Sequence, residues 1–203
     1  MTLVNGTLFA GTQSGQILAW KASSEEANPF IPVSVPSSVT HEGAVVCLCY
    51  GGNRLFSGSL DSSIKVWDEN LQCVATLKGH SDGVMSLVFW GYYLLSCSLD
   101  GTVKIWATSQ GGQIEENYTH KEGHGVLALN GITLPKKTDA EADQNILLCS
   151  CNDNSVRLYA LPSFEEKGRF FTRQEVRTIQ KGPGGLIFTG DGAGRTTVWK
   201  TNV

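Results

Sequence analysis

Residues 94–106 read LLSCSLDGTVKIW, which is a short apolar run, a Leu-Asp-Gly turn and a β-branched run that closes on an aromatic residue. Alternating apolar residues on both sides of an Asp-Gly turn predict an antiparallel hairpin. Four segments of the same length align with this one without a gap, namely residues 8–20 (LFAGTQSGQILAW), 55–67 (LFSGSLDSSIKVW), 147–159 (LLCSCNDNSVRLY) and 187–199 (IFTGDGAGRTTVW). Their closing aromatic residues stand at 20, 67, 106, 159 and 199, so the steps are 47, 39, 53 and 40 residues. A period of this size is typical of a repeat that contains four strands.

The segments between the hairpins supply the remaining strands. Short apolar segments before the hairpins predict innermost strands at residues 44–49, 84–89, 126–129 and 176–179. More polar segments after the hairpins predict outer edge strands, as at residues 73–77 and 167–171. Residues 23–38 and 135–145 lengthen two of the steps and are expected to be surface loops. We therefore expect an all-β protein, a β-propeller of four-stranded antiparallel blades with about five blades present, as one domain over residues 1–203; the blades would be 1–39, 40–78, 79–121, 122–172 and 173–203.

One motif resembles a known family. Gly79-His80, followed by residues 96–106 (SCSLDGTVKIW), is similar to the signature of WD repeats. The resemblance implies that a His, a Ser, an Asp and a Trp of each repeat form a structural hydrogen-bonded set. Two repeats agree in spacing, with 20 residues from His to Asp, 4 from Ser to Asp and 6 from Asp to Trp. The implied sets are His41, Ser57, Asp61 and Trp67; His80, Ser96, Asp100 and Trp106; and, with two substitutions and a longer His-to-Asp interval, His124, Cys149, Asp153 and Tyr159.

The first and last repeats depart from this pattern. Ala10 and Ser14 stand at the Ser and Asp positions of the first repeat, and Thr189 and Ala193 stand there in the last. We therefore expect the hydrogen-bonded core to be firmest between about residues 41 and 110.

The order of the repeats resembles the propeller of plant proteins that join CCCH zinc fingers to WD repeats. Residues 8–22 (LFAGTQSGQILAWKA) followed by 41–68 (HEGAVVCLCYGGNRLFSGSLDSSIKVWD) carry this resemblance, which covers nearly the whole chain. In that family the zinc fingers precede the propeller and bind nucleic acid; no Cys-x-Cys pair here has a suitably spaced His, so finger function is not expected to transfer. The resemblance favours the last five blades of a seven-bladed propeller, with a closed five-bladed ring as the other possibility. An open arrangement is expected to self-associate through unpaired edges.

Composition excludes several classes of protein. The chain has 203 residues, of which 41% are hydrophobic, and a formal net charge of −3. The negative net charge argues against nucleic-acid binding by the chain alone, because such binding requires clustered Lys and Arg residues. No apolar run reaches the ~18 residues of a membrane span, so no membrane partner is expected. Six cysteines lie in strand-like segments and are interpreted as reduced thiols, which places the chain inside the cell, in the nucleus or the cytoplasm.

The recurring Ser, His and Asp residues also permit a catalytic-triad interpretation, in which Ser57 or Ser96 would be the nucleophile. A catalytic triad occurs once, in a cleft, whereas these residues recur with the repeat, so we expect no enzyme. Residues 190–195 (GDGAGR) align with the hairpin turns and lack the Lys-Ser/Thr of a phosphate-binding loop. The cysteines lack a Cys-x-x-Cys pair or paired His, so neither a metal nor another cofactor is expected.

Function is therefore expected at the surface. The residue before each turn Asp should project into solvent, and these positions are occupied by Gln13, Leu60, Leu99 and Asn152. Leu60 and Leu99 would form a small apolar patch suited to a peptide, unless they pack into adjacent loops. At the opposite ends of the strands, Trp90 and Tyr92 form a second candidate, for which local packing is the favoured interpretation and partner docking the alternative. We expect a non-enzymatic scaffold for a protein or peptide partner; the alternative is part of an RNA- or DNA-binding CCCH zinc-finger protein whose propeller recruits partners.

Overall fold

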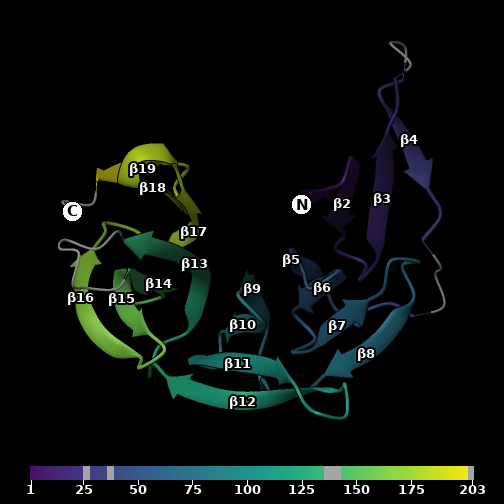
Figure 1. The fold of residues 1–203 in the computed structure, drawn as a ribbon. Helices are drawn as coiled ribbons and strands as arrows, with labels where there is room; N and C mark the ends of the chain where they lie inside the picture. Colours follow the sequence, from purple (N-terminus) through teal and green to yellow (C-terminus); the bar gives the residue numbers. More distant parts are fainter. Residues whose placement is uncertain (25–27, 36–38, 135–142, 201–203) are drawn as a thin grey trace. The chain divides into compact units, whose positions relative to one another are not determined.

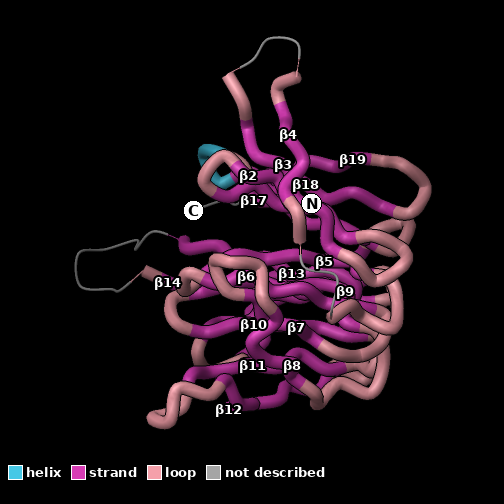
Figure 2. Tube along the Cα trace, turned by 90° about the vertical axis from the view of Figure 1, so that its right-hand side faces the viewer, coloured by secondary structure: helices cyan, strands magenta, loops and turns pink. Residues whose placement is uncertain are grey.

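The described residues of the computed structural model are 1–24, 28–35, 39–134 and 143–200, and they form an all-β structure (Figure 1). Apart from the strands, this part of the chain contains one short 3₁₀ turn, η1 (Pro183–Gly185), drawn in cyan in Figure 2. The predicted all-β class with antiparallel blades is confirmed.

Five antiparallel sheets follow one another along the chain, and each contains only consecutive strands. The first contains β1 (Thr2–Val4), β2 (Thr7–Gly11), β3 (Ile17–Ala22) and β4 (Phe30–Val33). The second contains β5 (Val45–Gly51), β6 (Arg54–Ser59), β7 (Ile64–Trp67) and β8 (Cys73–Leu77). The third contains β9 (Val84–Trp90), β10 (Tyr93–Ser98), β11 (Thr102–Thr108) and β12 (Ile114–Lys121). The fourth contains β13 (Val126–Leu134), β14 (Gln144–Cys151), β15 (Ser155–Leu161) and β16 (Glu165–Phe171). The fifth contains β17 (Val176–Lys181), β18 (Leu186–Asp191) and β19 (Thr196–Lys200).

Two of the expected loops differ from the structure. Residues 23–38 are not only a loop, because they contain β4, which pairs with β3 and completes the first sheet. The apolar residues Phe30, Ile31 and Val33 supplied a strand signal that the surrounding Ser and Pro residues obscured. The other expected loop, residues 135–145, ends earlier, because β14 begins at Gln144; its residues 135–142 lie outside the described part of the chain.

The hairpin turns share one backbone feature. Gly15, Ser62, Gly101, Asn154 and Gly194 stand at the same turn position, and their φ angles are 84°, 65°, 77°, 64° and 81°. Only Gly, and to a lesser degree Asn, adopts this left-handed region without strain. The turn geometry therefore explains why Gly or Asn occupies four of the five positions.

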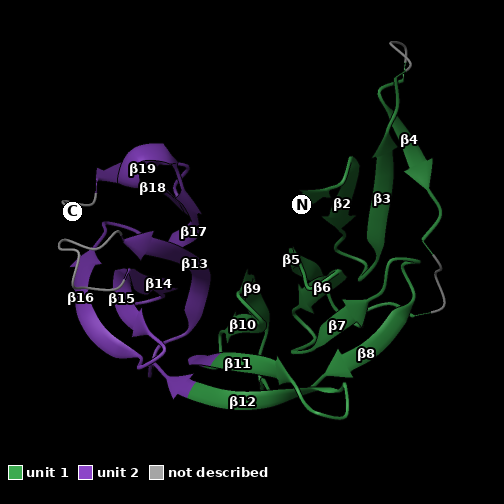
Figure 3. Cartoon of the chain, in the orientation of Figure 1, with its two compact units in different colours: residues 1–100, 104–119 green, residues 101–103, 120–203 purple. Residues whose placement is uncertain are grey.

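The described residues form two compact units, which Figure 3 colours separately: residues 1–100 with 104–119, and residues 101–103 with 120–203. In the first unit, neighbouring sheets pack face to face. Phe9 and Ala19 of the first sheet pack against Leu55 and Trp67 of the second. The other face of the second sheet packs against the third in the same way, with Leu94 and Trp106 taking the places of Leu55 and Trp67. Burial of each such side chain contributes about 1.5–3 kcal/mol.

The second unit repeats this packing between the fourth and fifth sheets. Leu148 and Val156 are fully buried and pack with Ile179 and Ile187 of the fifth sheet, and Trp199 covers the edge of this cluster. Each unit thus has its own hydrophobic core, and that core fixes the strands that carry the polar sets described below.

Candidate partner-binding face

The second repeat contains a closed set of buried hydrogen bonds. The Nδ1 atom of His41 lies 2.8 Å from Oδ2 of Asp61, and its Nε2 atom lies 2.8 Å from Oγ of Ser57. The indole N–H of Trp67 donates to the same hydroxyl at 2.9 Å. Since the Ser57 oxygen accepts from Trp67, its own hydrogen is available for His41 Nε2, and this pattern assigns the Nδ1-protonated neutral imidazole.

The third repeat repeats this geometry. His80 Nδ1 lies 2.9 Å from Asp100 Oδ2, and His80 Nε2 lies 2.7 Å from Ser96 Oγ. Trp106 donates to Ser96 at 2.8 Å. In each set the Asp also accepts the backbone N–H of the residue after the His. The sets therefore link the hairpin turn of one sheet to the loop before its innermost strand.

Burial and hydrogen bonding set the charges within these sets. Burial lowers the pKa of His41 and of His80 below the ordinary 6.5, and the neighbouring carboxylates offset this only in part. Burial opposes the charge of Asp61, but hydrogen bonds from Ser63, from His41 and from the Glu42 N–H outweigh it and lower the pKa of Asp61 to about 2. The folded chain thus holds a neutral imidazole against an ionised carboxylate.

We expect the free energy of unfolding to fall when the pH is lowered from 7 to 5, and to fall further toward pH 2. Because folding lowers the pKa of His41 and His80 below 6.5, the unfolded chain binds more protons in the first window. Lowering the pKa of Asp61 from 3.8 to about 2 adds about 2 kcal/mol of stability, which is lost below pH 4. Urea unfolding followed by tryptophan fluorescence at pH 7.5, 5.5, 4 and about 2.5 measures both losses. Equal stability at pH 7.5 and 5.5 would contradict the assignment of neutral imidazoles.

The fourth repeat differs from the sequence-based expectation for His124, Cys149, Asp153 and Tyr159. The side chain of His124 is half exposed, and its Nε2 atom lies 3.7 Å from Asp153 Oδ2. Glu122 takes the position expected for His124. The backbone N–H of Glu122 donates to the carbonyl oxygen of Gly101, and the N–H of His41 donates in the same way to Gly15. Both glycines are the residue with positive φ in the hairpin turn of the preceding repeat, so Glu122 and His41 occupy equivalent positions.

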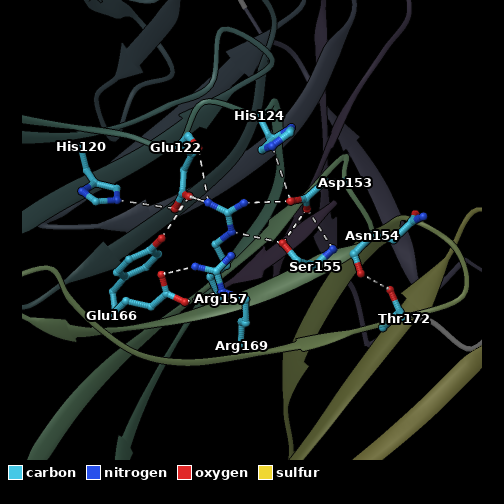
Figure 4. A network of polar contacts seen from close by, with 11 residues as sticks. His120, Glu122, His124, Asp153, Asn154, Ser155, Arg157, Glu166, Arg169 and Thr172 are labelled. Carbon is cyan, nitrogen blue, oxygen red and sulfur yellow. Dashed lines mark hydrogen bonds and ion pairs between the residues drawn. The ribbon is translucent and has the colours of Figure 1, made fainter.

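A buried ionic network replaces the neutral set in this repeat (Figure 4). Oε2 of Glu122 accepts from Nη1 of Arg157 at 2.6 Å and from the Tyr159 hydroxyl at 3.0 Å. Nη2 of Arg157 donates to Asp153 Oδ2 at 2.8 Å. Arg157 thus bridges the inner loop and the hairpin turn, which the imidazole does in the second and third repeats. Cys149 is fully buried at the position of Ser57, and Tyr159 reaches past it to Glu122.

The network extends to His120, which sequence reasoning did not identify. Its ring lies 4.7 Å from the Tyr159 ring and 5.0 Å from the Phe164 ring, measured between centroids. Nε2 of His120 is 3.7 Å from Oε1 of Glu122. The polar contacts of this repeat therefore extend beyond residue 110, and the expectation that the core is firmest between about residues 41 and 110 stays a prediction.

The fifth repeat keeps one bond of the set. Trp199 donates to Thr189 Oγ1 at 2.9 Å, as Trp67 does to Ser57. Thr172 takes the position of His41, since its N–H donates to the left-handed turn residue Asn154. Ala193 takes the position of the turn Asp and cannot accept a hydrogen bond through its side chain.

The two predicted surface leucines lie side by side in the first unit. Leu60 and Leu99 are 49% and 36% exposed, and they precede Asp61 and Asp100 at the hairpin turns. Gly83 lies beneath both, because a Cβ atom there would stand 2.8 Å from Leu60 Cδ2 and 3.8 Å from Leu99 Cδ1. The hydrogen-bonded Asp residues hold both turns in place, so this apolar patch is rigidly presented.

The other candidates occupy further turns of the chain. Gln13 in the first unit and Asn152 in the second are exposed at the equivalent turn positions. Trp90 is partly buried, whereas Tyr92 is 90% exposed and lines a shallow pocket with Phe89 and Arg54.

The structure also bears on catalysis and metal binding. Ser57 and Ser96 have no exposed surface and already accept an indole N–H, so neither hydroxyl can reach a substrate. Among the described residues, no group of three or more His, Cys, Asp or Glu side chains is arranged to hold a metal ion. All six cysteines are free, and burial raises the pKa of the Cys47 thiol to about 12. The described residues include no helix of the length and hydrophobicity needed to cross a membrane.

Comparisons with known proteins agree with this geometry. Residues 34–68 and 71–107 match the family described as WD domain, G-beta repeat. The chain is 56% identical over 197 residues to zinc finger CCCH domain-containing protein 17 of Oryza sativa subsp. japonica, which covers 97% of this chain and 43% of the relative. It is 52% identical over 200 residues to zinc finger CCCH domain-containing protein 59 of Arabidopsis thaliana. This match covers 98% of this chain and 41% of the relative. The chain thus spans less than half the length of these relatives.

Solved structures share the fold at low sequence identity. The computationally designed Ika8 protein matches with a TM-score of 0.69 at 21% identity, over 98% of this chain and 57% of that chain. A chain of the Mitotic Checkpoint Complex matches with a TM-score of 0.71 at 20% identity, over 97% of this chain and 58% of that chain.

The repeated hairpins form a β-propeller fold, and its second and third repeats carry buried His-Ser-Asp-Trp sets. The family match over two repeats confirms that the chain carries WD repeats. Over nearly its whole length it is similar to plant proteins that are named as CCCH zinc finger proteins, as the sequence indicated.

Proposed function

We propose that the chain is a non-enzymatic scaffold that holds a protein or peptide partner at its hairpin turns. The observation that carries this proposal is the pair of exposed leucines, Leu60 and Leu99, which lie together over Gly83 on turns fixed by buried hydrogen bonds. Exposed apolar side chains on a rigid support lose little conformational entropy on binding, which favours their use as anchors for a partner.

Replacing Leu60 and Leu99 together with Asp is expected to weaken partner binding by at least about tenfold while leaving the fold intact. Two charges at the patch would have to be desolvated against an apolar partner group, at a cost of about 1.4 kcal/mol or more, which is a factor of ten in affinity. Peptides selected from a random library with the unmodified chain provide the probe, and fluorescence polarisation measures their affinities.

Val74→Asp is the matched control. Val74 is 49% exposed, as Leu60 is, but it lies on the outer strand β8 and not at a hairpin turn. The control variant should bind the selected peptides as the unmodified chain does. Unchanged affinity in the Leu60→Asp/Leu99→Asp variant would contradict the proposed site.

The relatives support a second proposal, which is that the chain is the partner-recruiting part of a longer RNA- or DNA-binding protein. Their printed names include a CCCH zinc finger domain, and the chain spans less than half of their length. The net charge of −3 disfavours nucleic-acid binding by this chain itself. Filter binding of the chain to RNA at physiological salt tests this charge argument, because tight binding there would contradict it.

We also propose an intracellular location, in the nucleus or the cytoplasm, which the six free thiols support. Self-association remains a prediction. It rests on the unpaired strand edges of an open arrangement. The exposed apolar side chains of the first sheet support it, since Leu3, Leu18 and Phe30 expose 65%, 42% and 42% of their surfaces, and sedimentation velocity of the chain tests it.

A further inference from the structure

The fifth repeat inverts the charge of the site that the second and third repeats use for structure. In the second repeat His41, Asp61 and Ser63 form a hydrogen-bonded cluster around an ionised carboxylate. The same positions of the fifth repeat carry Thr172, Ala193 and Arg195. The carboxylate has been lost, and a guanidinium has been placed where a small hydroxyl stood.

A pocket of about 200 Å³ occupies this place in the second unit. Its lining includes Thr172, Arg173, Thr189, Arg195, Thr197 and Trp199. The floor is pre-organised, because Trp199 donates to the buried hydroxyl of Thr189 at 2.9 Å and Thr172 Oγ1 is held by two backbone carbonyls. The imidazole and carboxylate that fill the corresponding space in the second and third repeats are replaced here by smaller side chains.

The charges around the pocket are unbalanced. Within the described residues, the guanidinium groups of Arg173 and Arg195 form no ion pair, whereas the neighbouring Arg177 lies 3.8 Å from Glu175. The carboxylate in the lining, Asp191, directs its Oδ1 atom to the backbone N–H groups of residues 193 and 195. Residues 172–200 hold five cationic and two anionic side chains, in a chain whose net charge is −3. The local excess of positive charge therefore belongs to this repeat.

We propose that this pocket binds one anionic side chain, a phosphorylated residue or a carboxylate, of an extended peptide. Two guanidinium groups supply planar donors that match phosphate and carboxylate oxygens. A peptide fits better than RNA, because RNA binding depends on many phosphate contacts along a basic stripe and this site offers two arginines. The inference rests on the proposed scaffold function and specifies the chemistry of a second contact on the partner.

Oriented peptide libraries test the proposal with the intact chain. Three libraries with random flanks carry a fixed phosphothreonine, a fixed glutamate or a fixed threonine at the centre. We expect at least about tenfold stronger binding of the phosphothreonine library, the glutamate library or both, relative to the threonine library, because only the anionic side chains form charge-assisted hydrogen bonds with the guanidinium groups. The ratio of the first two distinguishes phosphate from carboxylate. Equal binding of all three would overturn the proposal.

Variants locate the binding. Arg195→Ala and Ala193→Asp are each expected to remove the preference for the anionic library, the second by placing a carboxylate beside Arg195. Arg177→Ala is the matched control, because Arg177 lies in the same repeat, is exposed and is not in the lining. Equal losses in Arg177→Ala and Arg195→Ala would overturn the site, as would stronger Arg195-dependent binding of a labelled 20-nucleotide oligouridine than of either anionic peptide library.

The Leu60→Asp/Leu99→Asp variant separates this inference from the scaffold proposal. If that variant loses its selected peptides while Arg195→Ala leaves the anionic preference unchanged, the scaffold stands and the pocket fails. If neither variant changes peptide binding, both fail.

Discussion

Replacing Glu122 with Gln is expected to lower the free energy of unfolding by about 3 kcal/mol, because it leaves a buried guanidinium without its main counter-charge. The Glu122 side chain has no exposed surface, and its Oε2 atom accepts from both Arg157 and Tyr159. Gln keeps the shape and one acceptor, so the loss reports the charge and not a cavity. Urea unfolding of the intact chain, followed by tryptophan fluorescence, measures the change.

Two further variants make this result specific. Glu115→Gln is the matched control, because Glu115 is exposed on β12, and it should change the stability by less than about 0.5 kcal/mol. The double replacement Glu122→Leu/Arg157→Met should be less destabilising than either single replacement, because it removes both charges together. Additive losses, or a loss below about 1 kcal/mol for Glu122→Gln, would show that the network contributes little.

The repeat pattern was sufficient to predict the two strands of each hairpin, because each hairpin carries its own turn residues and its own closing aromatic residue. The outer strand β8 was predicted at its observed bounds, Cys73–Leu77. Strand β4 was missed, because its residues lie in a segment rich in Ser and Pro and its pairing with β3 depends on tertiary structure.

The second and third polar sets followed from spacing alone, whereas the fourth did not. Counting four residues back from the first buried valine of the inner strand leads from Val45 to His41, and from Val126 to Glu122. The count thus identifies Glu122 as the equivalent of His41. The WD-repeat pattern expects a histidine there and therefore led to His124 instead. The sequence alone did not identify the partners of the Arg157 guanidinium, because Glu122 lies 35 residues earlier and only the packed structure brings the two side chains within hydrogen-bonding distance.

Replacing Ser57 with Ala is expected to cost about 2–4 kcal/mol of stability, although it removes a single oxygen atom. The Ser57 hydroxyl accepts from Trp67 and donates to Nε2 of His41, and all three side chains are buried. The replacement leaves an indole N–H and an imidazole nitrogen without partners, and each such group costs about 1–3 kcal/mol. The free energy of unfolding is measured with urea at pH 7.5, where the imidazole is neutral.

Ser57→Thr distinguishes the loss of the hydroxyl from a general intolerance of this position. Thr189 occupies the equivalent position of the fifth repeat and accepts from Trp199 at 2.9 Å, so a threonine hydroxyl can serve an indole in this geometry. Ser57→Thr should therefore lose less stability than Ser57→Ala, even though its extra methyl group must fit into a buried site. Ser81→Ala, at an exposed position, should be neutral within about 0.5 kcal/mol. If Ser57→Thr proves as destabilising as Ser57→Ala, packing and not the shared hydroxyl determines the stability of this repeat.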